Sequence, residues 1–215
     1  MASLEEQVLE IIRNNPEVIL ESIKEYESQQ QQQVQVAQQA FLQEIKTQPQ
    51  VVIGSSPITG STDYQVVLVE FSDFQCPLCA KVRDTVGEFI DKNQDKVTLI
   101  YKHLPHSQIH PEALDAAKAA YAAHQQGKFW SYHDALFSQQ QQLGEELYLG
   151  IAEDLGLDLE QFNRDCSQRD TMEMIQKDID LATKLGIGET PFFFFQGSTF
   201  SGALPLEKCE ELLSK

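Results

Sequence analysis

The feature that most constrains this chain is an apolar strand that runs directly into two cysteines and then into a helix. Residues 65–73 (QVVLVEFSD) are nearly continuously apolar, as strands buried on both faces are. FQCPLC follows, and the next residues, AKVRDTVGEFIDKN, have the amphipathic pattern of a helix. Pro77 suits the first helical turn, where a backbone N–H has no intrahelical partner. The stretch predicts a strand–turn–helix unit with Cys76 at the start of the helix.

The remaining strand signals predict a sheet. β-branched and aromatic runs predict strands around Val51–Ile53, in VTLIYKHLP, in TPFFFFQG and in STFSG, and a Gln-Gly turn joins the last two. PLEKCEELLSK predicts a short closing helix that starts at a proline.

The stretch between VTLIYKHLP and TPFFFFQG, residues 111–186, is helical in pattern throughout. We therefore expect an α/β fold, a mixed central sheet flanked by helices. Residues 47–108 and 187–215 form the two parts of the sheet domain in this scheme, and residues 109–186 form an inserted all-helical domain.

The first 46 residues predict a helical arm. An apolar helical pattern ends near Asn14, and a second helix spans residues 16–46 from Pro16 through a glutamine-rich stretch. Its apolar stripe is thin and has little core of its own, so it needs the main domain or another subunit as a partner. We therefore expect a homo-oligomer that assembles through residues 1–46.

The charge of the chain bears on its partners. The sequence has 33 acidic and 16 basic residues, a net charge of −17, which disfavours nucleic acid and anionic lipid as partners. It has no run of 18 apolar residues, so no membrane span is expected. No basic stretch followed by an apolar core opens the sequence, so no signal peptide is expected in it. A cytosolic protein and a protein whose leader has been removed both fit.

Three kinds of chemistry are open to the Cys76–Cys79 pair: metal binding, a structural cross-link and electron exchange. Structural zinc normally takes four ligands in two short-spaced pairs, but Cys166 and Cys209 lie far apart in sequence. The first N–H groups of a helix favour negative charge, so a thiol there ionises readily. A CxxC near a strand–helix unit is a redox signal. The alternative of another class is a chaperone or metal carrier that holds Cu(I) between two thiolates.

VLVEFSDFQCPLC resembles the DsbA family of thiol–disulfide oxidoreductases. Residues 110–137 are similar to the inserted helical domain of that family, and residues 162–207 to its return to the sheet, so the resemblance covers about residues 51–215. It implies the thioredoxin fold, with Cys76 as the nucleophile and Cys79 as the resolving thiol. It also implies cysteine-containing protein substrates, a redox partner that resets the pair, and no organic cofactor.

The resemblance implies a role for Thr190 and Pro191 as well. In the family, this residue pair forms a loop that faces the cysteines, with a cis peptide bond before the proline, and presents its backbone to an extended substrate. DsbA carries valine in place of Thr190, whereas threonine is more typical of related disulfide isomerases. Leu78 stands where DsbA has a histidine that stabilises the thiolate. We therefore expect a potential less oxidising than the roughly −120 mV of DsbA.

Glu70 is expected to act near the cysteines, since it is a carboxylate in an otherwise apolar strand. Lys102 in the next strand is the expected partner, and the resemblance implies that an acid here moves protons during exchange. A salt bridge without a catalytic part is the alternative. Asp73 either tunes the Cys76 thiol or shapes the turn before it.

Two further groups of side chains have structural alternatives. Cys166 and Cys209 either form a second disulfide or stay as buried thiols. His103, His106 and His110 have a spacing that suits a metal, but histidines at strand ends and in loops are commoner.

The sequence as a whole predicts a disulfide oxidase that works through Cys76–Cys79. An oligomeric disulfide isomerase or reductase is the alternative, suggested by Thr190 and by residues 12–29, which resemble N-terminal segments of DsbA-like proteins that oligomerise. The resemblance places the protein in the periplasm or another oxidising compartment, with the cytoplasm left open.

Overall fold

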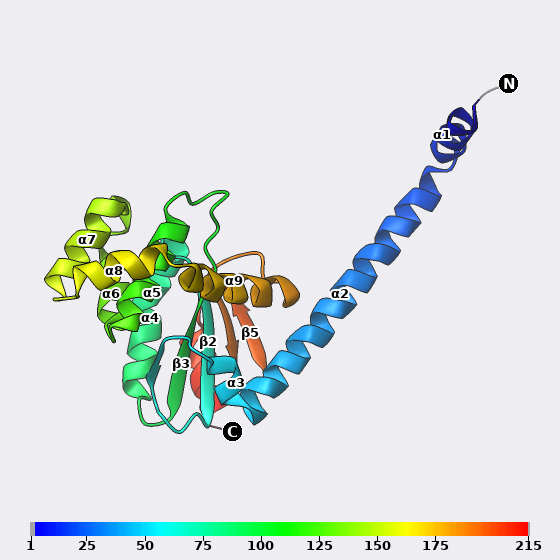
Figure 1. The fold of residues 1–215 in the computed structure, drawn as a ribbon. Coiled ribbons are helices and arrows are strands. Elements are labelled where there is room, and N and C mark those ends of the chain that lie inside the picture. The colour runs from blue at the N-terminus through cyan, green and yellow to red at the C-terminus, as the bar shows by residue number, and fades with distance from the viewer. Residues whose placement is uncertain (1–2, 215) are drawn as a thin grey trace.

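The computed structural model describes residues 3–214, in which a mixed sheet lies between two layers of helices (Figure 1). The strand order is β1-β3-β2-β4-β5. The strands are β1 Ile58–Gly60, β2 Val66–Ser72, β3 Val97–His103, β4 Phe192–Phe195 and β5 Ser198–Ser201. The predicted α/β class, with a mixed sheet flanked by helices, is confirmed.

Strand β2 lies at the centre of the sheet and ends at the cysteine motif. It runs parallel to β3 and antiparallel to β4, while β1 pairs with the outer side of β3. Strands β4 and β5 form a hairpin as predicted. Its turn residues Gln196 and Gly197 have positive φ angles of 46° and 79°, which match the right-handed twist of a tight hairpin.

After β2, two helices cover one face of the sheet, and the other helices lie between β3 and β4 in the sequence. Helices α4 Pro77–Lys92 and α10 Leu206–Leu213 pack on one face of the sheet with the cluster that contains Phe193 and Phe195. Between β3 and β4 the chain is helical. The elements there are α5 Ala113–Gln125, α6 Phe129–Ser138, η1 Gln140–Gln142, α7 Glu145–Asp154, α8 Leu159–Ser167 and α9 Arg169–Lys184.

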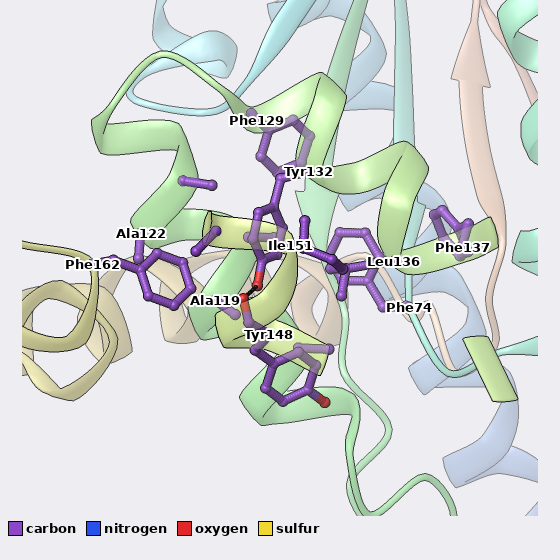
Figure 2. Packing of buried hydrophobic residues seen from close by; sticks show 14 of the residues in the cluster. Phe74, Ala119, Ala122, Phe129, Tyr132, Leu136, Phe137, Tyr148, Ile151 and Phe162 are labelled. Carbon is purple, nitrogen blue, oxygen red and sulfur yellow. Dashed lines mark hydrogen bonds between the residues drawn. The ribbon is translucent and has the colours of Figure 1, made fainter. Parts of the chain in front are cut away.

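Helices α5 to α8, with η1, form a helical block that has its own core (Figure 2). Phe129, Tyr132, Leu136 and Phe162 are buried there, and the Tyr132 hydroxyl donates a hydrogen bond of 2.8 Å to the Tyr148 carbonyl. Helix α9 instead packs on the sheet, where its Ala182 joins the cluster of β2.

The arm consists of α1 Leu4–Asn14 and α2 Pro16–Thr47, close to the predicted bounds. The C-terminal part of α2 is docked on the sheet domain. There Phe41 and Ile45 are buried, the Phe41 and Phe194 rings lie 4.9 Å apart, and the Gln38 amide donates to the Leu185 carbonyl at 2.8 Å. The rest of α2 and all of α1 extend away from the body (Figure 1).

The predicted strand around Val51–Ile53 is wrong. These residues belong to helix α3 Pro49–Ile53, and the first strand comes later, at Ile58. Pro49 occupies the first turn of α3, and Gly54 ends it with a φ of +53°. Val52 is buried. Packing of this turn has outweighed the strand preference of its β-branched residues.

Lys102 lies on the face of β3 that is turned toward α9. Its Cα pairs with Phe71, so it shares the face of Phe71 and lies opposite to that of Glu70. The Lys102 ammonium lies 3.3 Å from Asp178 of α9 and donates to the Ser56 hydroxyl at 2.7 Å. Asp178 also accepts a hydrogen bond from the His103 N–H. The expected Glu70–Lys102 pair is therefore wrong, because side chains alternate between the faces of a strand.

We expect Asp178→Ala to lower the free energy of unfolding by about 3–5 kcal/mol, because it leaves the buried Lys102 ammonium without a counter-charge and the His103 N–H without its side-chain acceptor. Denaturant unfolding measures this change. Asp180→Ala, on the exposed side of the same helix, is the matched control and is expected to change stability by less than about 0.5 kcal/mol. A loss in Asp178→Ala no larger than in the control contradicts the assignment.

Candidate active site

Cys76 lies at the junction between β2 and α4, at the N-cap of the helix. Pro77 occupies the first helical position, as predicted. The Cys76 N–H donates to the Asp73 carbonyl at 3.1 Å, and the Cys76 carbonyl accepts from Ala80 N–H at 3.2 Å. The Cys76 sulfur therefore faces the unpaired N–H groups of the first turn of α4.

The two thiols of the motif differ in acidity. A hydrogen bond from the Cys79 thiol lowers the pKa of Cys76 to about 5, with help from Thr190 and from the backbone N–H groups of Cys79 and Leu78, although burial opposes the shift. Burial raises the pKa of Cys79 well above its ordinary value, and the hydrogen bond to Cys76 adds to the rise. Cys76 is thus a thiolate at neutral pH beside a protonated Cys79. Leu78 between them is exposed.

The loop before β4 faces the Cys76 sulfur. The Thr190–Pro191 peptide bond is cis, and the Cys76 Sγ lies 3.3 Å from the Thr190 carbonyl oxygen. Thr190 is buried. Because β4 is the antiparallel neighbour of β2, the sheet itself brings this loop to the end of the strand that carries Cys76.

Asp73 is the organising residue of the loop before Cys76. Its side chain is fully buried and accepts hydrogen bonds from Gln75 N–H at 2.8 Å, from His106 N–H at 2.9 Å and from the His110 ring at 2.7 Å. It therefore shapes the turn, one of the two expected roles, and also holds the loop that follows β3. Sequence reasoning missed this second role, since no local pattern pairs residues 33 positions apart.

Glu70 is buried behind the motif, and burial raises its pKa to about 7. Two buried hydroxyls lie nearby, that of Tyr101, which pairs with Glu70 in the parallel register, and that of Ser72. Among the described residues, neither hydroxyl has a hydrogen-bond partner of normal geometry. The Ser72 hydroxyl nonetheless lies close enough to both Glu70 and Cys79 to lower the pKa of each, against the larger effect of burial. Sequence reasoning missed Ser72 and Tyr101. Their polar ends within strand sequences are the only signal that marks them.

A cavity of about 200 Å³ leads to Glu70 from the side of α4 and α6. Arg83, Trp130, His133 and Asp134 are among the residues that line it. Glu70 therefore has a route to solvent that is separate from the face on which Cys76 meets Thr190.

The structure distinguishes the two alternatives for Cys166 and Cys209, a second disulfide or separate thiols. Cys166 and Cys209 are free thiols. Cys166 packs against the core of the helical block, whereas Cys209 is buried on the sheet face covered by α4 and α10. Burial is the main cause that raises the pKa of each to about 11, so neither is a reactive thiolate at neutral pH.

The three histidines do not gather at one point. Residues 3–214 contain no group of three or more His, Cys, Asp or Glu side chains arranged for a metal. His110 is bound to Asp73, while His103 is buried among the rings of Phe74, Tyr101 and Phe129. Burial lowers the pKa of His103 to about 3, so its ring is neutral.

A family model described as Thioredoxin matches residues 53–215. The chain belongs to the thioredoxin family. Its solved neighbours include a thioredoxin-like oxidoreductase from Silicibacter pomeroyi DSS-3, with 31% identity, a TM-score of 0.68, and coverage of 75% of this chain and 91% of that one. The thiol-disulfide exchange protein alpha-DsbA2 from Wolbachia pipientis is 25% identical, with a TM-score of 0.71 and coverage of 83% and 97%. The predicted thioredoxin fold and the predicted resemblance to DsbA-like oxidoreductases are confirmed.

ScsC from Proteus mirabilis, in a structure of a transitional conformation, shares the fold over almost the whole chain. The identity is 22% and the TM-score 0.69, and the match covers 96% of this chain and 92% of that one.

Some curated relatives are much longer than this chain. The Na(+)/H(+) antiporter NhaA 3 from Salinispora tropica is 35% identical over 150 residues, which are 70% of this chain and 23% of the antiporter. The antiporter NhaA from Herminiimonas arsenicoxydans is 36% identical over 146 residues, again 23% of its length. The chain thus spans about a quarter of these relatives. Along residues 3–214, no helix is both long and apolar enough to cross a membrane.

We expect Glu70→Gln to make the folded protein more stable at pH 8 than the unmodified chain. The pKa of Glu70 rises from 4.5 to about 7 on folding, so its contribution is present in full below pH 4.5 and is lost as the pH rises through 7. The substitution removes a penalty of up to about 3 kcal/mol at pH 8 and changes little at pH 4.

Denaturant unfolding of both proteins at pH 4, 6 and 8 measures this difference. Glu88→Gln, on the exposed side of α4, is the matched control. If Glu70→Gln is no more stable than the unmodified chain at pH 8, Glu70 does not have the raised pKa that its burial gives it.

Proposed function

We propose that the protein is a thiol–disulfide oxidoreductase that oxidises cysteines of protein substrates through Cys76 and Cys79. The observation that carries the proposal is the Cys76 sulfur itself. It lies at the start of α4 with a pKa lowered to about 5, and it faces the Thr190 carbonyl at 3.3 Å. A stabilised thiolate is both a good nucleophile and a good leaving group.

The oxidase reaction consists of two exchanges. A substrate thiolate attacks Sγ of Cys76 in the Cys76–Cys79 disulfide, a bond forms between the two, and Cys79 leaves with the electron pair. A second substrate thiolate then attacks the substrate sulfur of this mixed disulfide, and Cys76 leaves as a thiolate. The substrate gains a disulfide and the Cys76–Cys79 pair gains two electrons, which a redox partner then removes.

Glu70 supplies the proton that Cys79 needs when it leaves. The pKa of Cys79 is raised by burial, so a Cys79 thiolate takes up a proton at once, and Glu70 with a pKa of about 7 holds one near neutral pH. Ser72 is close to both groups, and the cavity beside Arg83 and Asp134 supports exchange of that proton with solvent. Lys102 is assigned no part in this transfer, because it pairs with Asp178 on the other face of the sheet.

The Thr190–Pro191 loop is the proposed place of the substrate backbone. The Thr190 carbonyl already meets the Cys76 sulfur, so a peptide bound along this loop has its own sulfur in line with Cys76. The oxidising role suits the periplasm or another oxidising compartment. The Wolbachia pipientis relative alpha-DsbA2 is a thiol-disulfide exchange protein, which is consistent with this role.

We expect Cys76→Ser to lose thiol–disulfide exchange by at least about a thousandfold, because the mixed disulfide forms on Cys76. Cys79→Ser is expected to trap a covalent complex with a cysteine-containing peptide. The assays are oxidation of a reduced two-cysteine peptide and refolding of a scrambled protein. Cys209→Ser is the control and is expected to keep wild-type rates. Wild-type rates in Cys76→Ser contradict the proposal.

The arm favours a second function, that of an oligomeric disulfide isomerase or reductase. Its projecting part exposes apolar side chains along α1 and α2. They are Leu4, Val8, Leu9, Ile11, Ile12, Val18, Ile19, Leu20, Ile23 and Tyr26. A long exposed apolar stripe on a helix is typical of a surface that packs against other helices in a coiled coil. In such an assembly, several Cys76 sites act on one substrate, which suits reshuffling of wrong disulfides.

We expect gel filtration with light scattering to give an oligomer for residues 1–215 and a monomer after deletion of residues 1–30, which leaves the docked Phe41 and Ile45 in place. Ile19→Glu is expected to weaken the oligomer because it places a charge on the stripe. Ser28→Glu, on the opposite side of α2, is the matched control. A monomeric full-length chain would rule out the assembly and leave the oxidase as the better proposal.

A further inference from the structure

Gln140 of the helical block contacts the backbone of the nucleophile. Its side-chain amide nitrogen donates hydrogen bonds to the Phe74 carbonyl at 2.8 Å and to the Cys76 carbonyl at 2.9 Å. A glutamine amide has two N–H groups, so one nitrogen makes both bonds. The two carbonyls belong to the loop that enters α4, whereas Gln140 lies in η1, 64 residues beyond Cys76.

The same loop is anchored to the block by a side chain. Phe74 is buried with its ring 5.0 Å from that of Phe137 and 5.7 Å from that of His133, both on α6. In Figure 2, Phe74 lies beside Leu136 at the edge of the core of the block. Phe74 therefore fixes the position of the loop, while Gln140 fixes the orientation of the Phe74 and Cys76 carbonyl groups.

A second contact keeps η1 in place relative to α4. Arg83 of α4 donates to the Asp134 carbonyl at 3.1 Å and to the Ser138 hydroxyl at 2.9 Å, at the end of α6. Residue 140 follows two positions later. Arg83 thus ties α6 to the helix that begins with the cysteine motif, and the Gln140 amide is held at a fixed distance from Cys76.

We propose that Gln140 is a positioning residue for Cys76, through which the helical block sets the acidity of the nucleophile. This inference deepens the proposed function and rests on it. The Cys76 thiolate is stabilised by donors that include the N–H groups of Leu78 and Cys79. A shift of the Cys76 backbone would move the sulfur relative to these donors, and Gln140 holds that backbone through the Cys76 carbonyl. Fixed donors stabilise charge more than mobile ones do, because they need no reorganisation.

Gln140 also acts on charge directly. The Phe74 and Cys76 carbonyls each carry partial negative charge close to the thiolate, and the Gln140 N–H groups neutralise part of it. Without them, the two oxygens repel the sulfur anion more strongly, and the Cys76 carbonyl keeps only the hydrogen bond from the Ala80 N–H. Both effects raise the Cys76 pKa when the amide is lost, and a less stable thiolate makes the disulfide less oxidising.

The test replaces Gln140 with two residues of similar length. Gln140→Glu exchanges a donor for an acceptor, and Gln140→Met has no donor at all. Gln141→Glu, the exposed neighbour, adds the same charge without reaching the loop and is the matched control. Absorbance of the Cys76 thiolate at 240 nm between pH 3 and pH 9 gives its pKa, in a Cys166→Ser and Cys209→Ser background, and thermal unfolding gives the stability of each variant.

We expect the midpoint of the Cys76 titration to rise by about one pH unit in Gln140→Glu and by about half a unit in Gln140→Met, and to stay within about 0.2 units in Gln141→Glu. The rate of peptide oxidation is expected to fall about tenfold in Gln140→Glu. An unchanged midpoint in folded Gln140→Met and Gln140→Glu overturns the inference, even when both variants unfold at a lower temperature, because a purely structural hydrogen bond changes stability alone. If Gln140→Glu does not fold, Gln140→Met decides the matter.

The titration needs no substrate, so it separates this inference from the proposed function. An inactive wild-type protein whose midpoint still shifts with Gln140 contradicts the oxidoreductase and leaves the positioning role. An active wild-type protein whose Cys76 midpoint does not change in the Gln140 variants supports the oxidoreductase and contradicts the positioning role.

Discussion

The stabilised negative charge on the Cys76 sulfur is the interaction on which the rest of this site depends. Cys76 lies at the N-terminus of α4, beside the Cys79 thiol and the Thr190 side chain, and its pKa is lowered to about 5. That value lies between the roughly 3.5 of DsbA and the roughly 7 of thioredoxin. Leu78 offers no charge to the thiolate, so helix and thiol contacts account for the shift, and we expect an intermediate potential.

The sheet and the helical block contact the Cys76 loop from two sides. Strand β4 brings Thr190 and Pro191 to the end of β2, because the two strands are antiparallel neighbours. On the other side, Phe74 packs in the core of the block, and Gln140 of the block donates a hydrogen bond to the Cys76 carbonyl. Buried Glu70 lies behind the pair on the face of β2 toward α4 and has its own route to solvent. Cys76 at the start of α4, the Thr190–Pro191 loop before β4 and Glu70 within β2 thus approach the site from three different elements.

Local patterns in the sequence predicted the elements of the site well. The apolar run of β2, Pro77 at the first turn of α4 and the Gln196–Gly197 turn each follow from residues next to one another in the chain. The resemblance supplied Thr190 and Pro191.

What the sequence could not predict depends on residues that meet only in the folded chain. Lys102 was paired with Glu70 because both are charged residues in strands, but the register puts them on opposite faces, and Asp178, 76 positions beyond Lys102 and close to it in space, becomes its partner. The choice between a second disulfide and free thiols was open for the same reason, because only the fold shows that Cys166 and Cys209 belong to separate cores. Ser72, Tyr101 and Gln140 carry no motif, and their roles come from strand register and from the docking of the block.

The pKa of Cys76 is the measurement that tests this account most directly. Ultraviolet absorbance of the thiolate, or the rate of alkylation of reduced protein by iodoacetamide as a function of pH, gives it without any assumption about substrate. The account predicts a midpoint near 5 and a rate that is constant above about pH 6. A midpoint near the roughly 8.5 of a free cysteine would contradict it, because α4, Cys79 and Thr190 would then not be stabilising the sulfur anion.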